Sequence, residues 1–221
     1  MNLMAPKIQI ALDTLDGQHA LDLARLVAPY VDILEAGTPL LKSVGIDIVR
    51  KLKAAHPDKL VLADLKSSDV GAYEAKMAFE AGADITTTLG VTTLATIEEV
   101  QREADRWNRR CEVDMTGVAD PVARAREVKS VGVSLVLYHR SIDEELTKGA
   151  SWNDRACQIV NDLTALGIDV SVAGGVDVEK LPLLCSMSLY GIVVGRGITA
   201  QADPAAAALA IARSVKELWL A

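Results

Sequence analysis

The sequence predicts an α/β protein that folds as a single (β/α)8 TIM barrel over residues 1–221. Two observations predict this fold. A short β-branched apolar run followed by a longer helical segment recurs eight times, at a spacing of roughly 25 residues. Polar side chains recur where the apolar runs end. With 221 residues, half of them hydrophobic, the chain is long enough for one domain with a sizeable core, and no linker interrupts it.

Eight apolar runs are the expected strands, because each is short and bounded by polar residues or glycine. They are Ile8–Leu12, Val31–Leu34, Leu60–Ala63, Ile85–Thr88, Glu112–Met115, Leu135–Tyr138, Val170–Ala173 and Gly191–Val194.

The segments between these runs are the expected helices. They include Gly17–Val27, Ile46–Ala55, Gly71–Ala81, Thr93–Trp107, Val122–Val131, Trp152–Leu166 and Ala205–Trp219. Asp203 and Pro204 supply an N-cap and a first-turn proline for the last helix. Gly82 and Gly167 stand where C-terminal caps belong.

The alternation of strands and helices predicts a parallel sheet, either open or closed into a barrel. The polar residues at the strand ends favour the barrel, because a barrel brings the carboxyl ends of all its strands to one mouth, where an enzyme site can use them. These residues are Asp13, Glu35, Asp64, Lys66, Asp114 and His139.

Charge and composition exclude several classes of function. Lys plus Arg is 23 and Asp plus Glu is 30, which gives a net charge of −7 with no basic patch, so nucleic acid is not an expected partner. No apolar stretch approaches the roughly 20 residues that span a bilayer, and no targeting segment is recognisable, so we expect no membrane and a cytoplasmic protein. Three cysteines without CxxC spacing indicate reduced thiols.

The densest chemical group is the segment Asp64–Asp69, which follows the third apolar run. Alternation along an extended chain puts Asp64 and Lys66 on one face, where the ammonium group could stabilise an oxyanion or deliver a proton. A surface salt bridge explains the same spacing equally well. Glu35 and Asp64 are suitable hard ligands for Mg²⁺, although spacing alone favours a structural pair between Glu35 and Lys66 without an ion.

Two glycine pairs follow the last two apolar runs. Gly174 and Gly175 follow the seventh, and Gly195 and Gly197, which flank Arg196, follow the eighth. Barrels often bind phosphate with these two loops, so the sequence predicts a small phosphate ester as substrate. His139 follows the sixth run and could exchange protons, or could be an ordinary loop residue.

Taken together, the Asp64-x-Lys66-x-x-Asp69 motif, Glu35, His139 and the paired glycine loops resemble the orotidine phosphate decarboxylase superfamily, over nearly the whole chain. Within it, the chain is similar to the branch that holds 3-keto-L-gulonate-6-phosphate decarboxylase and 3-hexulose-6-phosphate synthase. The resemblance implies a homodimer in which Asp69 reaches into the partner's site.

The resemblance also implies roles for the other residues of the site. Glu35 and Asp64 would hold Mg²⁺, and Lys66 would lie beside an enediolate intermediate. Asp13 would hydrogen-bond within this cluster, Asp114 would orient the lysine or the substrate hydroxyls, and His139 would help deliver a proton.

The implied activity is a carbon–carbon lyase reaction, with decarboxylation favoured over the alternatives. The substrate would be 3-keto-L-gulonate 6-phosphate, an intermediate of L-ascorbate catabolism, and the products L-xylulose 5-phosphate and CO2. The segment 138–141, Trp152 and the segment 195–199 look like the decarboxylase. Asp114, Ile142 and Ala173 look like the synthase, which condenses formaldehyde with D-ribulose 5-phosphate. A phosphosugar-binding barrel without catalysis is a further alternative.

Overall fold

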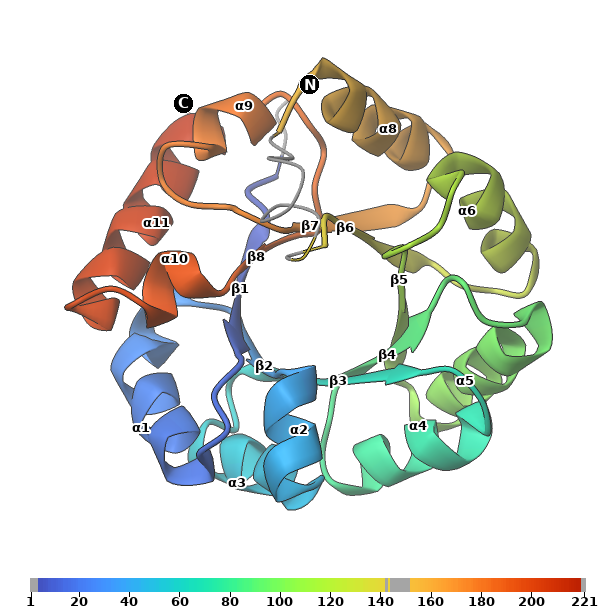
Figure 1. Cartoon of the computed structure of the whole chain (residues 1–221), viewed down its shortest axis with the longest axis horizontal. Coiled ribbons are helices and arrows are strands. Elements are labelled where there is room, and N and C mark those ends of the chain that lie inside the picture. Colours follow the sequence, from blue (N-terminus) through green and yellow to red (C-terminus); the bar gives the residue numbers. More distant parts are fainter. Residues whose placement is uncertain (1–3, 142, 144–151, 220–221) are drawn as a thin grey trace.

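The computed structural model describes residues 4–141, 143 and 152–219, and within them eight parallel strands close into a barrel in sequence order (Figure 1). The strands are β1 Lys7–Leu12, β2 Ile33–Ala36, β3 Leu60–Ser67, β4 Ile85–Leu89, β5 Arg110–Asp114, β6 Leu135–His139, β7 Asp169–Ala173 and β8 Gly191–Val194. The predicted (β/α)8 barrel is therefore confirmed.

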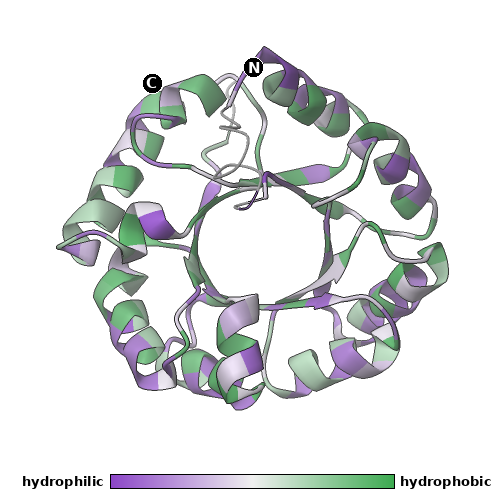
Figure 2. Cartoon of the chain, viewed as in Figure 1, coloured by the Kyte–Doolittle hydropathy of each residue, from purple (hydrophilic) through white to green (hydrophobic). Residues whose placement is uncertain are grey.

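The helices form a ring around the barrel. They are α1 Gly17–Val27, the 3-10 turn η1 Ala28–Tyr30, α2 Thr38–Val44, α3 Asp47–Ala55, α4 Gly71–Glu80, α5 Leu94–Trp107, α6 Pro121–Ser130, α8 Asp154–Ala165, α9 Leu181–Leu184, α10 Arg196–Thr199 and α11 Pro204–Trp219. Figure 2 shows hydrophilic residues concentrated on the outer faces of this ring. The apolar faces of the helices pack on the outward side chains of the strands and form the main hydrophobic core.

Strand register determines which side chains enter the barrel. In a barrel of this type, inward side chains stack in layers contributed by alternate strands. One layer contains mainly polar residues, and the register assigns to it Gln9, Leu62, Glu112 and Ser171. The layer above it, toward the carboxyl ends of the strands, holds Glu35, Thr87, Leu137 and Val193. Polar groups therefore extend from the mouth down to the middle of the barrel.

Several predicted boundaries differ from the structure. The third strand was expected to end at Ala63 but continues to Ser67, and the second covers Ile33–Ala36 rather than Val31–Leu34. Both end later than expected because their last residues alternate between the barrel wall and the cavity, so the apolar run stops before the strand does. Helix α2 was not predicted.

The predicted helix caps are confirmed. The amide of Ala206 donates to the Asp203 carboxylate at 2.9 Å, as expected of an N-cap, and Gly82 and Gly167 take left-handed conformations after helices. The three cysteines are unpaired. Within the described residues, no helix combines the length and apolarity needed to cross a membrane.

Candidate active site

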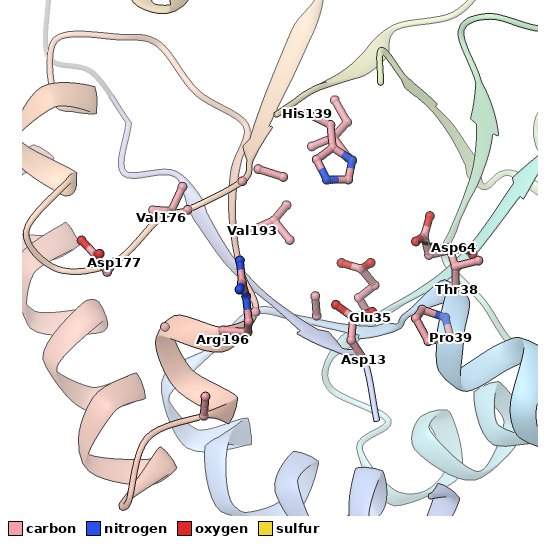
Figure 3. Close-up of a pocket in the computed structure, with 18 of the residues that line it drawn as sticks. Asp13, Glu35, Thr38, Pro39, Asp64, His139, Val176, Asp177, Val193 and Arg196 are labelled. Carbon is pink, nitrogen blue, oxygen red and sulfur yellow. Dashed lines mark hydrogen bonds between the residues drawn. The ribbon is translucent and has the colours of Figure 1, made fainter. Parts of the chain in front are cut away.

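A cavity of about 720 Å³ opens at the carboxyl ends of the strands (Figure 3). Its lining includes most of the candidate site residues that the sequence singled out: Asp13, Glu35, Asp64, Lys66, His139, Gly174, Gly175, Gly195 and Arg196. Its volume suits a small-molecule ligand. In Figure 3, Arg196 and Asp64 lie on opposite sides of the cavity, with Glu35 and Asp13 between them.

Lys66 lies between two buried carboxylates. Its Nζ donates to Oδ2 of Asp64 at 2.6 Å and lies 3.1 Å from Oδ2 of Asp114. Burial alone would lower the pKa of Lys66, but these two carboxylates outweigh it and raise that pKa above its ordinary value. Lys66 is therefore held as an ammonium ion at the cavity wall. The surface salt bridge that its spacing also allowed is ruled out, because Lys66 lines the cavity and both of its carboxylate partners are buried.

The backbone at Lys66 leaves the regular strand. Its φ is +48°, in the left-handed region that only a few per cent of non-glycine residues adopt, and the pairing of β3 with β4 shifts register between Ala63 and Ser67. The amide of Lys66 donates to Oγ1 of Thr87 at 2.8 Å, and that hydroxyl donates to Oδ1 of Asp64 at 2.7 Å. Thr87 therefore fixes both members of the pair, so the bulge directs the lysine back toward Asp64.

Asp114 connects Lys66 to His139. Its Oδ2 lies 3.0 Å from Nδ1 of His139, and its Oδ1 accepts hydrogen bonds from the amide and hydroxyl of Thr116. Burial alone would raise the pKa of Asp114, but the hydrogen bond from His139 and the charge of Lys66 lower it well below its ordinary value. An ionised Asp114 accepts from Nδ1 of His139, which leaves Nε2 for proton exchange in the cavity.

Glu35 and Asp13 are acidic neighbours of this pair. Glu35 is buried, and its Oε2 accepts a hydrogen bond from Nε2 of Gln9 at 2.7 Å. Burial, followed by the charges of Asp64 and Asp13, raises the pKa of Glu35 well above its ordinary value. Burial and the charge of Asp64 likewise raise the pKa of Asp13. Repulsion among these carboxyl groups creates a region in which a bound cation would be stabilised.

The donor set fits Mg²⁺. Glu35 and Asp64 offer carboxylate oxygens, the ligands this ion prefers, and a divalent cation would relieve the repulsion between them. Among the described residues, no group of three or more His, Cys, Asp or Glu side chains is arranged to hold a metal. Two carboxylates would leave the remaining positions to water and substrate, as is usual for Mg²⁺.

The opposite wall carries the two glycine loops. Gly174 and Gly175 both have positive φ values, +97° and +61°, and a Cβ on Gly174 would lie 2.3 Å from the carbonyl oxygen of Arg140. Only glycine fits this close approach. Gly195 and Arg196 complete the wall at the end of β8.

Three further candidate residues, Asp69, Ala173 and Ile142, differ in their position relative to the cavity. Asp69 is exposed and does not line the cavity of its own chain. Ala173 is buried and lines it. Ile142 lies outside the described residues.

Sequence reasoning missed three residues of the site. The hydroxyl of Thr38 lies 2.6 Å from Oδ2 of Asp64, and the side chain of Gln9 contacts Glu35. Lys180, paired with Asp177 at 2.6 Å, lines the cavity near the glycine loops. The Gly-Thr-Pro sequence at 37–39 is a helix-start signal that could have revealed Thr38. No local pattern marks Lys180.

Fold and site define a (β/α)8 barrel protein in which carboxylates, an ammonium group and an imidazole meet in one cavity. Comparison with known proteins identifies its family. The model of the orotidine 5'-phosphate decarboxylase / HUMPS family matches residues 6–211, and the chain belongs to this family.

Similar proteins come from two groups within this family. 3-Hexulose-6-phosphate synthase of Mycobacterium gastri is 41% identical over 206 residues, which cover 91% of this chain and 96% of the relative. 3-Keto-L-gulonate-6-phosphate decarboxylase UlaD of Escherichia coli is 35% identical over 214 residues, which cover 97% of this chain and 98% of the relative. A crystal structure of KGPDC from Streptococcus mutans, solved as a ligand complex, has a TM-score of 0.93 at 32% identity and covers 98% of this chain and 100% of that one. The chain thus belongs to the branch that the sequence indicated.

Proposed function

We propose that this protein is a Mg²⁺-dependent carbon–carbon lyase that decarboxylates 3-keto-L-gulonate 6-phosphate to L-xylulose 5-phosphate and CO2. The observation that carries the lyase proposal is the continuous contact from Asp64 through Lys66 and Asp114 to His139, which combines a fixed cation with an oriented proton carrier. We choose decarboxylation because the segment 138–141, Trp152 and the segment 195–199 look like the decarboxylase, and because the chain matches KGPDC over 98% of its length.

The substrate's phosphate would bind the wall formed by Gly174, Gly175, Gly195 and Arg196. Arg196 supplies charge, and the glycines let backbone N–H groups approach the phosphate oxygens. Asp13, which lines the cavity beside Glu35, would accept a hydrogen bond from a sugar hydroxyl. These contacts would place the keto acid end of the substrate against Lys66.

Carbon–carbon cleavage then creates a negative charge that Lys66 faces. The bond between the carboxylate carbon and its neighbour breaks, CO2 leaves, and the electron pair spreads over that neighbour and the adjacent carbonyl oxygen as an enediolate. The ammonium group of Lys66 stabilises this oxyanion. Its raised pKa makes it a poor proton donor, so we assign delivery of the proton to carbon to Nε2 of His139.

Mg²⁺ held by Glu35 and Asp64 would supply further positive charge to the oxygens of the substrate. Treatment with a chelator should lower activity at least about 100-fold, and added Mg²⁺ should restore it. Mg²⁺ should also raise the melting temperature of the wild-type protein but not of Glu35→Gln, whereas Glu103→Gln, on the outer helix α5, should respond like the wild type. Full activity after chelation would refute the roles of Glu35 and Asp64.

The synthase is the second candidate, because its M. gastri member has the higher identity and because Asp114 and Ala173 resemble that enzyme. Both reactions need an enediolate, so the site alone serves either. The deciding experiment assays purified protein with Mg²⁺ for CO2 release from 3-keto-L-gulonate 6-phosphate and for condensation of formaldehyde with D-ribulose 5-phosphate. Dominant condensation would replace the proposed activity. Binding of both sugar phosphates without turnover would indicate a non-catalytic barrel.

We further propose that the active unit is a homodimer in which Asp69 serves the partner's site. Its exposure and its position outside its own cavity support this arrangement. Lys66→Met and Asp69→Asn should each be nearly inactive, yet mixing them with subunit exchange should recover about a quarter of wild-type activity, because half of the dimers would contain one intact site. A mixture that stays inactive despite heterodimer formation would contradict the shared site.

A further inference from the structure

The carbonyl oxygen of Gly174 is held from outside the cavity. The indole Nε1 of Trp152 donates to it at 3.0 Å, and Nη1 of Arg140 lies 3.3 Å away. The guanidinium of Arg140 lies 5.2 Å from the Trp152 ring centroid, and the ring of Tyr138 packs against the same indole with the centroids 5.9 Å apart. Trp152 is 5% exposed and belongs to the main hydrophobic core, so this donor is fixed in place.

This contact determines the direction of the next amide. The described residues contain no cis peptide bond, and in a planar trans peptide the N–H points opposite to the C=O. Because the Gly174 carbonyl points to Trp152, which does not line the cavity, the N–H of Gly175 points the other way. Gly174 and Gly175 both line the cavity, and their positive φ values leave the loop other conformations unless something holds it.

We propose that Trp152 is a positioning residue for anion binding, which holds the Gly174 carbonyl away from the cavity so that the Gly175 amide faces the substrate's phosphate. The inference rests on the proposed function, since it requires that the glycine wall binds a phosphate. Loss of the indole N–H would let the carbonyl dipole turn toward the anion, and a carbonyl oxygen repels a phosphate oxygen.

The chain provides a matched control. Trp219 is also 5% exposed, and its Nε1 donates to the carbonyl oxygen of Met187 at 3.3 Å, away from the cavity lining. Trp152→Phe and Trp219→Phe each remove one buried indole N–H from one backbone carbonyl. Only the first should affect the anion.

The experiment measures binding of inorganic phosphate by calorimetry and the kinetics with the phosphorylated substrate. Trp152→Phe should weaken phosphate binding and raise KM by about fivefold, the size expected for one hydrogen bond, with kcat within about twofold of wild type. Trp219→Phe should match the wild type in both.

Each outcome has one consequence. Phosphate that binds Trp152→Phe as tightly as the wild type would overturn the inference and leave the proposed function intact. Equal weakening in both variants would assign the effect to packing and would also overturn it. A wild-type protein that does not bind phosphate would remove the anion wall and the proposed substrate class with it.

A spectroscopic measurement covers the case in which Trp152→Phe does not fold. The sequence has three tryptophans, so the double variant Trp107→Phe/Trp219→Phe keeps Trp152 as its single indole emitter. Saturation with phosphate should change the emission of Trp152, because the loop it holds contacts the anion. Unchanged emission at saturating phosphate would contradict the proposal.

Discussion

Lys66→Met should lower kcat at least about 1000-fold while phosphate binding stays close to wild type. The ammonium group lies 2.6 Å from Asp64 and 3.1 Å from Asp114, and these two carboxylates keep it protonated despite its burial. Methionine has a similar length and no charge, so the variant removes the oxyanion stabiliser and little volume. The effect should appear in kcat rather than KM, because the oxyanion exists only after the bond begins to break.

A second lysine separates catalysis from folding. Lys53 pairs with Asp84 at 2.9 Å at the amino-terminal end of the barrel. The two lysine side chains are equally exposed, at 27% for Lys53 and 26% for Lys66. Their aspartate partners, Asp84 and Asp64, are 7% and 6% exposed. Lys53→Met should therefore cost similar stability and keep kcat. If both variants lose activity in proportion to their melting temperatures, Lys66 has a structural role and the mechanism is wrong.

The barrel could be predicted from the sequence because its outer wall and its helices obey simple patterns. Apolar runs located every strand, but the boundaries failed where the site begins. Glu35, Asp64 and His139 were expected after their strands, yet all three are inside them. A strand continues as long as its backbone pairs, whereas the apolar run stops at the first inward polar residue, so the mismatch itself marks the mouth of the barrel.

Contacts in the site could be predicted between residues that are close in the sequence. Contacts between residues that are distant in the sequence were harder to predict, because only the folded chain brings them together. The Asp64 and Lys66 contact follows from alternation, although the lysine reaches it through a bulge rather than a regular strand. Thr38 depends on a helix that apolar periodicity did not indicate. The Trp152 contact with Gly174 spans two loops, and nothing local encodes it.

The polar layer inside the barrel was also not predicted, and it contains a buried acid without a hydrogen-bond partner among the described residues. Glu112 is 1% exposed, and both of its carboxylate oxygens lack a hydrogen-bond partner among the described residues, as do Oε1 of Gln9 and Oγ of Ser171. Burial, followed by the charges of Asp114 and Asp64, raises the pKa of Glu112 to about 7. Because an unfolded glutamate has a pKa near 4.5, the folded protein binds the extra proton between these values.

Glu112→Gln should therefore stabilise the protein at alkaline pH. The sign follows from linkage: the folded state binds more protons than the unfolded state between about pH 4.5 and 7, so the contribution of Glu112 to stability falls as pH rises through that window and stays low above it. A shift of this size corresponds to about 3 kcal/mol. The neutral amide of glutamine removes the titration and can donate to the oxygens of Gln9 and Ser171. Urea unfolding at pH 8 should therefore show a gain of up to about 3 kcal/mol, which falls to about 1 kcal/mol at pH 5.

Glu103 provides the comparison that isolates the cause. It is 6% exposed, but its carboxylate accepts hydrogen bonds from Arg106 and Trp107 at 2.9 Å each, so it is buried with partners. Glu103→Gln should lose stability at both pH values, because it weakens an ion pair instead of removing an unpaired charge. A gain for Glu112→Gln that is equal at pH 5 and pH 8 would show that packing, and not ionisation, limits stability in this layer. A pH-dependent gain would mean that this barrel retains a costly buried acid directly beneath its carboxylate cluster.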